Sequence, residues 1–139
     1  MKKLLYSSIL ITLISCLWTS CSYFRSEQSF EEIMKEPAAS LNRTSGSMID
    51  KETRFDSGVV LPNKTFLYSY TLVNYDQSEL NVSGLKRDVE PVLKKRIIGD
   101  SEFQILRDNS ATIKYKYSDK NNNTLFILTF TPNDYLISK

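Results

Sequence analysis

The sequence predicts an α+β fold, in which an antiparallel sheet of about four strands carries one amphipathic helix packed on a face. Two pairs of alternating apolar segments are each joined by a short polar turn, as in β-hairpins. A segment with helical apolar periodicity separates the two pairs. Hydrophobic residues make up 41% of the chain, which is enough for a core. With a short helix before the first hairpin, the expected order is α-β-β-α-β-β.

The first helix is expected to begin at Ser29, because a hydroxyl group three residues before Glu32 fits a capping box. Its apolar face would contain Phe30, Ile33 and Met34. Pro37 is expected to end this helix. The following segment, 38–47, is rich in Ser, Asn, Thr and Gly and is typical of a mobile linker.

The first hairpin is expected over residues 53–74. Thr53–Leu61 alternates between apolar and polar residues, and Pro62-Asn63-Lys64 has the composition of a turn. Thr65–Asn74 carries apolar residues on both faces, which is typical of an inner strand.

An amphipathic helix is expected from about Ser83 to Ile98, with Gly99 as its C-terminal cap. Its apolar stripe would contain Leu85, Val89, Val92, Leu93 and Ile97. Pro91 leaves two alternatives open: the helix kinks at this residue, or the main helix begins there.

The second hairpin follows a segment, Ser101–Arg107, whose pattern fits a short helix or the start of a strand. Ala111–Tyr117 and Thr124–Thr131 alternate as strands, and Pro132 ends the second of them. The polar segment Asp119–Asn123 between them is typical of a hairpin loop.

The N-terminus has the features of an export signal. Lys2 and Lys3 precede an apolar run, Leu4–Ile14, that would span only about 16 Å as a helix. A membrane-spanning helix needs roughly 20 residues, so a cleavable signal fits better than a permanent anchor.

Leu13-Ile14-Ser15-Cys16 resembles the lipobox of bacterial lipoproteins, in which an apolar residue lies three places before the cysteine and a small residue directly before it. The resemblance implies cleavage before Cys16 and attachment of acyl chains to it, which would anchor the protein in a membrane. Cys21 is the alternative acceptor, although Trp18 fits the third place poorly. Anchoring would be in the inner or the outer membrane, with the domain outside the cytoplasm.

The expected organisation is a signal peptide over 1–15, a lipid-anchored tether with a short helix over 16–47, and an α+β domain over 48–139. Loss of Lys2 and Lys3 would leave 16 basic and 16 acidic side chains, so the mature chain would be neutral. A neutral domain is not expected to bind nucleic acid, which requires an excess of Lys and Arg.

Several kinds of catalytic chemistry lack their usual residues. The chain contains no histidine, its two cysteines both lie in the N-terminal region, and its four glycines are scattered. General-base histidine, thiolate chemistry, zinc–thiolate sites and phosphate-binding loops are therefore not expected. We expect a protein that is not an enzyme and that uses no cofactor or metal.

The carboxylates Asp50, Glu52 and Asp56 are the weak candidates for a glycan hydrolase, and a polar strand edge is the alternative interpretation. Asp119 and the segment 121–123 suggest a calcium loop, but the glycine and the distant glutamate of such a loop are missing. A hairpin loop is the favoured interpretation of this segment.

Five tyrosines lie in or beside the expected strands: Tyr68, Tyr70, Tyr75, Tyr115 and Tyr117. They form either an exposed platform for a peptide or glycan, or ordinary cross-strand packing, which is favoured. Lys94-Lys95-Arg96 together with Lys114 and Lys116 suggest a basic face, and separate solvated charges are the alternative.

Four segments carry a second resemblance: Met48–Ser57, Tyr68–Asn74, Tyr115–Asn121 and Thr131–Tyr135. Across 48–135 they resemble a family of small exported bacterial domains of uncharacterised function. The resemblance implies an address in the cell envelope and carries no catalytic residue.

We therefore predict a membrane-anchored lipoprotein of the bacterial cell envelope, whose domain binds another envelope component. The expected partner is a protein, contacted through a sheet edge or the tyrosine-rich face in an accessory, inhibitory or exclusion role. The alternatives are a carboxylate-only hydrolase acting on glycan and a carrier for a small apolar ligand. A carrier would need an apolar cavity between the sheet and the helix, and the oligomeric state stays open.

Overall fold

The computed structural model describes residues 28–136 of the chain. The expected signal peptide and both candidate lipid acceptors, Cys16 and Cys21, lie outside the described residues. Within residues 28–136, none of the helices combines the length and the apolar character that a membrane crossing needs.

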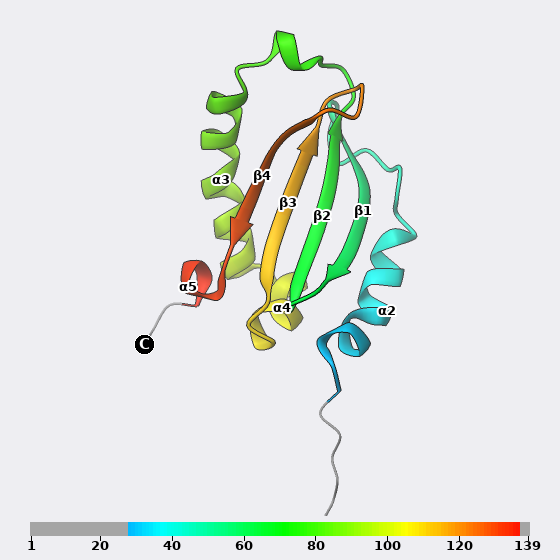
Figure 1. The fold of residues 1–139 in the computed structure, drawn as a ribbon, viewed down its shortest axis with the longest axis vertical. Coiled ribbons are helices and arrows are strands. Elements are labelled where there is room, and N and C mark those ends of the chain that lie inside the picture. The colour runs from blue at the N-terminus through cyan, green and yellow to red at the C-terminus, as the bar shows by residue number, and fades with distance from the viewer. Residues whose placement is uncertain (1–27, 137–139) are drawn as a thin grey trace, which may run out of the picture.

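A four-stranded sheet forms the centre of the fold, and its strands follow one another in sequence order (Figure 1). They are β1 (Thr53–Leu61), β2 (Thr65–Leu72), β3 (Thr112–Ser118) and β4 (Thr124–Phe130). β1 pairs with β2, and β3 with β4, in antiparallel fashion, so both predicted hairpins are confirmed. β2 is an inner strand, as its two apolar faces indicate.

The two central strands correct the expected topology, because β2 and β3 are parallel and the sheet is therefore mixed. Their register runs from Thr65 opposite Thr112 to Thr71 opposite Ser118. The cause is the path of α3 (Val82–Gly99), whose 18 residues span about 27 Å, nearly the length of β2. This helix returns the chain to the end of the sheet where β2 began, so β3 runs in the same direction as β2.

α3 is one continuous helix that contains Pro91, so the alternative in which the main helix begins at this residue is wrong. The Asn81 side chain caps its N-terminus by accepting a hydrogen bond from the Gly84 backbone N–H at 3.0 Å. Gly99 is the last helical residue, and Asp100 takes the capping position expected for it. Of the predicted apolar stripe, Leu93 and Ile97 are buried, whereas Val92 is exposed.

α2 (Phe30–Asn42) begins where the capping residue Ser29 predicts, but it continues through Pro37, and the expected end at that residue is wrong. Burial of Phe30 and Met34 in the core holds the helix against the domain on the N-terminal side of the proline. On the other side, the Asn42 side chain donates to the Gly58 carbonyl and accepts from the Gly58 N–H, both at 2.8 Å. Residues 38–42 are therefore a docked helix against β1, where a mobile linker was expected.

Four short helices complete the described residues, which therefore contain more helices than expected. They are η2 (Gln77–Glu79), η3 (Ser101–Phe103), α4 (Gln104–Asp108) and α5 (Pro132–Tyr135). η3 and α4 resolve the ambiguous segment Ser101–Arg107 as helical.

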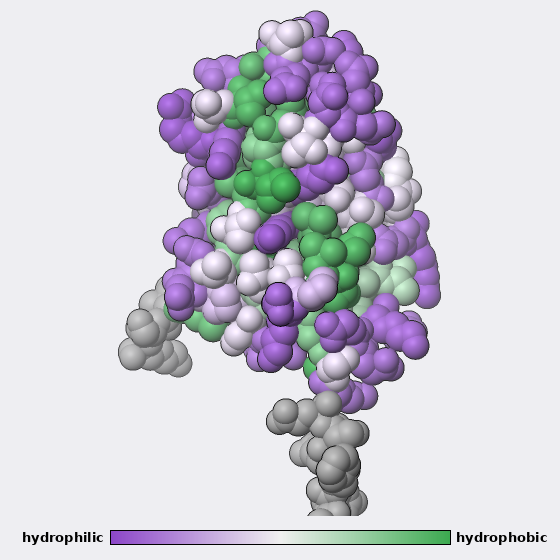
Figure 2. Space-filling model, viewed as in Figure 1, coloured by the Kyte–Doolittle hydropathy of each residue, from purple (hydrophilic) through white to green (hydrophobic). Residues whose placement is uncertain are grey.

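The core lies between the sheet and the helices. Strand side chains such as Phe66, Ile113 and Leu128 pack in one hydrophobic cluster with Phe30 of α2 and Ile97 of α3. α3 lies beside β4 and α2 beside β1 (Figure 1), so the two helices flank the same face of the sheet. Figure 2, drawn from the same side as Figure 1, shows hydrophobic patches that are divided by hydrophilic residues.

Candidate functional site

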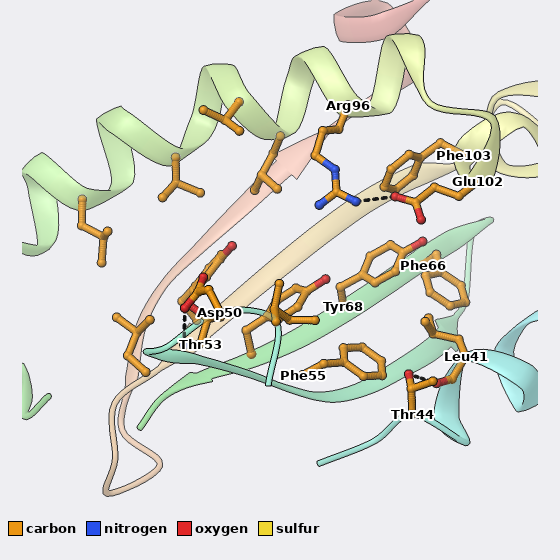
Figure 3. Close-up of a pocket in the computed structure, with 18 of the residues that line it drawn as sticks. Leu41, Thr44, Asp50, Thr53, Phe55, Phe66, Tyr68, Arg96, Glu102 and Phe103 are labelled. Carbon is orange, nitrogen blue, oxygen red and sulfur yellow. Dashed lines mark hydrogen bonds and ion pairs between the residues drawn. The ribbon is translucent and has the colours of Figure 1, made fainter. Parts of the chain in front are cut away.

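A cleft of about 630 Å³ opens between α2 and α3, over the middle of the sheet (Figure 3). Its floor consists of side chains from β1 and β2, including Phe55, Phe66 and Tyr70. Leu41 of α2 lies on one side, and α3 contributes an apolar wall that includes Val89. Small-molecule sites in proteins enclose about 300–1,000 Å³ and are lined mainly by apolar side chains, so this cleft has the size and the composition of such a site.

Two exposed apolar residues lie at the rim of the cleft. Val92 on α3 is 59% exposed, and Ile49, in the segment that leads into β1, is 56% exposed. Isolated exposed apolar residues are common, but these two line one concave surface. The rim therefore extends the apolar surface of the cleft to its opening.

Four tyrosines form a stacked row along the floor, and they come alternately from β2 and β3. Their order is Tyr68, Tyr115, Tyr70, Tyr117, with ring centroids separated by 5.1, 6.2 and 5.3 Å and interplanar angles of 12°, 13° and 23°. Parallel register places Tyr68 opposite Tyr115 and Tyr70 opposite Tyr117, which brings the rings into contact. Cross-strand packing, the favoured interpretation, is confirmed, and an exposed platform is wrong because Tyr115 and Tyr117 are buried.

The hydroxyl groups of this tyrosine row have no hydrogen-bond partner among residues 28–136. The other two tyrosines of that range are bonded: Tyr75 donates to the Glu52 carboxylate at 2.7 Å, and Tyr135 donates to the Ala111 carbonyl. Tyr115 is only 1% exposed, and its buried hydroxyl is unsatisfied within the described part of the chain. An unpaired buried hydroxyl is costly, which makes this row unusual for a purely structural cluster.

Burial keeps these hydroxyls protonated. It raises the pKa of Tyr117 to about 12 and raises the pKa of Tyr68, Tyr70 and Tyr115 further, mainly through desolvation of the charged form. All four groups therefore remain hydrogen-bond donors at any physiological pH.

Arg96 of α3 reaches toward the sheet above Tyr68 (Figure 3). Its Nε donates to Asp100 at 3.2 Å and its Nη2 to Glu102, and the guanidinium lies 5.8 Å from the centroid of the Phe103 ring. Its other terminal nitrogen, Nη1, donates no hydrogen bond to any described residue. The positive charge is thus balanced by two carboxylates, while one nitrogen remains available.

The charges that line the cleft are unbalanced. Asp50, Asp88 and Glu102 contribute three carboxylates, whereas Arg96 contributes the one guanidinium among the described lining residues. Backbone N–H groups of Glu52 and Thr53 donate to Asp50 at 2.8 Å. The bond from Glu52 is the larger cause that lowers the pKa of Asp50, so this carboxyl is ionised at neutral pH.

The structure does not bring the three candidate hydrolase carboxylates together. Asp56 accepts hydrogen bonds from Arg54 at 2.7 Å and from Thr71 at 2.6 Å. Asp50 and Glu52 lie near each other at a second hollow, of about 650 Å³, but the pKa of Asp50 is lowered where a general acid needs a raised one. The proposed carboxylate set is therefore not assembled, and absence of enzymatic activity stays a prediction.

Asp119 is a structural residue of the β3–β4 loop. Its carboxylate accepts from the backbone N–H groups of Asn121 and Asn123 at 2.8 Å, from the Asn123 amide at 2.9 Å and from the Gln77 N–H at 3.3 Å. These donors occupy the oxygens that a calcium ion would need, so the favoured hairpin loop is confirmed. Within residues 28–136, no cluster of three or more acidic, histidine or cysteine side chains could hold a metal ion.

The basic residues do not form one face. Lys114 and Lys116 alternate with Ile113 and Tyr115, so they point away from the helices, whereas Arg96 lines the cleft. Lys94 and Lys95 are exposed on α3. For the lysines, separate solvated charges are therefore a better interpretation than a single basic face.

Sequence reasoning missed three features of the cleft. Leu41 lies in a segment expected to be a linker, Arg96 was assigned to a solvated basic run, and Asp88 was not a candidate. Arg96 follows Val89 and Leu93 at helical spacing, so the three residues lie on one face of the helix. This spacing was the sequence signal that could have placed Arg96 in the cleft.

These features define a class: an α+β domain with a mixed sheet and an apolar cleft between two helices. The chain belongs to a domain family described as "Domain of unknown function (DUF8479)", whose profile matches residues 28–127. The matched range includes α2, which the resemblance over 48–135 had left out. That resemblance is confirmed in its coarser form, membership of a domain family of unknown function.

A solved structure from Pseudomonas aeruginosa shares the fold. It is described as a "putative secreted protein", and it is 9% identical to this chain with a TM-score of 0.64. The similarity covers 76% of this chain and 91% of the other. At this identity the similarity shows the fold alone. No curated protein matches the chain significantly.

Proposed function

We propose that this protein is a lipoprotein of the bacterial envelope whose domain binds a small apolar or amphiphilic envelope molecule in the cleft. The cleft between α2 and α3 is the observation that carries the proposal. Its volume of about 630 Å³ and its apolar floor and walls suit such a ligand. From the sequence, a carrier of a small apolar ligand was an alternative to the predicted protein-binding role. The carrier is preferred here to that role and to the hydrolase, whose carboxylates are dispersed.

The envelope address rests on the N-terminal sequence. The export signal and the lipobox-like Leu13–Cys16 support secretion and a membrane anchor at Cys16, with Cys21 as the alternative. The similar Pseudomonas aeruginosa protein is described as a "putative secreted protein", which agrees with an exported domain. An anchored carrier or sensor would meet apolar molecules at the membrane surface, where they are concentrated.

Binding of the fluorescent probe N-phenyl-1-naphthylamine tests the proposed site. The full chain carries Cys16→Ser and Cys21→Ser, so that no attached lipid competes with the probe. Val92→Trp, which enlarges an exposed residue of the cleft rim, should raise the Kd for the probe by roughly tenfold, because the indole occupies the opening.

Val59→Trp is the matched control, because Val59 is also exposed but lies on β1 outside the cleft. It should leave the probe Kd unchanged. Saturable binding that is equal in wild type and both variants would place the probe elsewhere and reject the cleft as the site.

A protein partner is the second candidate, and one observation favours it. Val59 and Ile127 are exposed apolar residues of the strands, 41% and 47% exposed, and the partly buried Lys114 and Lys116 lie on β3 between their strands. Such a surface suits a protein partner whose acidic side chains lie between apolar ones. A photo-crosslinking amino acid at Ile127 should then give a discrete adduct in the native envelope, whereas the same group at Glu90 of α3 should not.

A further inference from the structure

The tyrosine row lies under the cleft and presents hydroxyl groups that the described protein does not satisfy. Tyr68, Tyr70 and Tyr117 line the cleft directly, and Tyr115 lies between Tyr68 and Tyr70 in the stack. The parallel register places Tyr115 on the same face of the sheet as Tyr68 and Tyr70, below the residues that line the cleft. A ligand in the cleft would therefore meet the unused hydroxyl donors of Tyr68, Tyr70 and Tyr117 on a largely apolar floor.

Arg96 adds a further donor at the same place. Its Nη1 has no acceptor among residues 28–136, while Nε and Nη2 are held by Asp100 and Glu102. These two carboxylates fix the guanidinium in position and also neutralise it. The site thus offers several donors without offering a net positive charge.

The remaining charges limit the ligand further. Asp50, Asp88 and Glu102 line the cleft against the single Arg96 of the described lining, so an anionic head group would be repelled. A cationic ammonium head would be attracted, but it has no acceptor for the hydroxyl donors. A neutral head group rich in oxygen meets both requirements.

We propose that the cleft selects a neutral amphiphile with an oxygen-rich head group, of the acylglycerol class. The acyl chain would lie against the apolar walls, and the ester and hydroxyl oxygens would accept hydrogen bonds from the tyrosine row and from Nη1 of Arg96. This inference rests on the proposed function, because it names the ligand class of the same cleft.

Displacement of N-phenyl-1-naphthylamine from the full chain with both cysteines replaced compares three amphiphiles of one chain length. They are a monoacylglycerol, the fatty acid and the alkylammonium. The monoacylglycerol should displace the probe at a concentration at least about tenfold lower than either charged amphiphile, a difference equal to the net effect of one or two hydrogen bonds.

The double variant Tyr68→Phe/Tyr70→Phe removes the hydroxyls of two residues that line the cleft and removes no ring. The Kd for the monoacylglycerol, divided by the Kd for the probe, should rise about tenfold in this variant. Tyr75→Phe is the matched control, because the Tyr75 hydroxyl already donates to Glu52 and lies outside this cleft. Thermal melts of the ligand-free proteins should show the double variant about as stable as wild type, since neither hydroxyl donates a hydrogen bond within residues 28–136.

The outcomes separate the two proposals. Absence of saturable probe binding to the wild-type cleft overturns the proposed function and this inference with it. Probe binding without preference for the monoacylglycerol, or with a preference that the double variant retains, overturns this inference alone. A preference that is lost in Tyr68→Phe/Tyr70→Phe and kept in Tyr75→Phe supports it.

Discussion

Asp119 is the residue on which the β3–β4 loop depends. It is fully buried, and its two oxygens accept hydrogen bonds from the backbone N–H groups of Asn121 and Asn123 in the loop and of Gln77 in η2. Burial by itself raises its pKa, but the hydrogen bonds from Asn123, Asn121 and Gln77 outweigh this effect and lower it below the ordinary value of 3.8. A single carboxylate thus joins two segments that lie far apart in the sequence.

Asp119→Asn should lower the thermal midpoint at pH 7, because an amide nitrogen would face backbone donors that need an acceptor. A lowered folded-state pKa contributes stability above the unfolded-state value, and this stability is lost as pH falls through the folded-state value. The difference in thermal midpoint between wild type and Asp119→Asn should therefore become smaller below about pH 3.8. Circular-dichroism melts at pH 7, 5 and 3 measure it, and Asn122→Ala in the same loop is the control. A difference in thermal midpoint that stays constant with pH would contradict the stabilising role of the ionised Asp119 carboxylate.

At the scale of elements, α2 and α3 decide whether the cleft exists. α2 approaches β1 closely because Gly58 has no side chain: a Cβ there would lie 2.6 Å from Leu41 Cδ2 and 2.9 Å from Phe66 Cζ. α3 covers the other side of the same sheet face through Leu93 and Ile97. Each helix is therefore held by a few contacts that can be tested separately.

Gly58→Val should reduce the free energy of unfolding by about 1–3 kcal/mol, because the new side chain overlaps Leu41 and Phe66 and displaces α2 from β1. Urea unfolding followed by circular dichroism measures the change. Gly99→Ala is the control, since a Cβ at Gly99 meets nothing within 4 Å. Equal stability of Gly58→Val and wild type would show that the close approach of α2 is unnecessary.

Pro91→Ala should increase the free energy of unfolding by about 1–3 kcal/mol, because proline in a helix interior removes a hydrogen bond and clashes with the preceding turn. Pro91 is exposed, so the substitution leaves the core unchanged. The urea midpoint of this variant is compared with that of Glu90→Ala, an exposed neighbour. A lower midpoint for Pro91→Ala would mean that the native helix requires the proline.

The sequence predicts those elements whose signals are local. Both hairpins follow from alternation around the turns at Pro62–Lys64 and Asp119–Asn123, and Ser29 marks the start of α2. The predicted antiparallel pairing of β2 and β3 was wrong, because the relative direction of these strands depends on the path of α3. No local sequence pattern reports that path. The predicted end of α2 at Pro37 was wrong, because tertiary contacts of residues such as Leu41 outweigh the helix-breaking effect of the proline.

The candidate site was predictable only in part. Alternation places Tyr68 with Tyr70, and Tyr115 with Tyr117, on single faces of their strands. Their contact across β2 and β3 requires the parallel register, and the walls from Leu41 and Arg96 come from distant segments. A sequence pattern indicates which side chains share a face of the sheet. It does not indicate that α2 and α3 leave part of that face uncovered as a cleft.

At the scale of the whole molecule, the proposed anchor would hold the described domain near a membrane. The helix α2 begins at Phe30, and about 13 residues of sequence separate it from the proposed acceptor Cys16, so the tether would reach up to roughly 45 Å when extended. The cleft would then remain within reach of lipids released from that membrane. This geometry fits a domain that receives amphiphiles locally.

Metabolic labelling with radioactive palmitate tests the anchor. Wild type should incorporate the label, Cys16→Ala should lose it, and Cys21→Ala should retain it, because the lipobox resemblance favours Cys16. Loss of label in Cys21→Ala alone would reassign the acceptor. An unlabelled wild type, with a known lipoprotein labelled in the same cells, would reject lipidation altogether.

The parallel pairing of β2 with β3 also has a consequence for the order of assembly. Each hairpin can form from neighbouring residues, whereas joining Thr65 to Thr112 closes a long loop and is entropically costly. Because the tyrosine row takes alternate rings from the two hairpins, it is completed only when they join. Near-ultraviolet circular dichroism of these stacked rings would therefore follow the slow closing step of folding, while the far-ultraviolet signal would follow the earlier hairpins and helices.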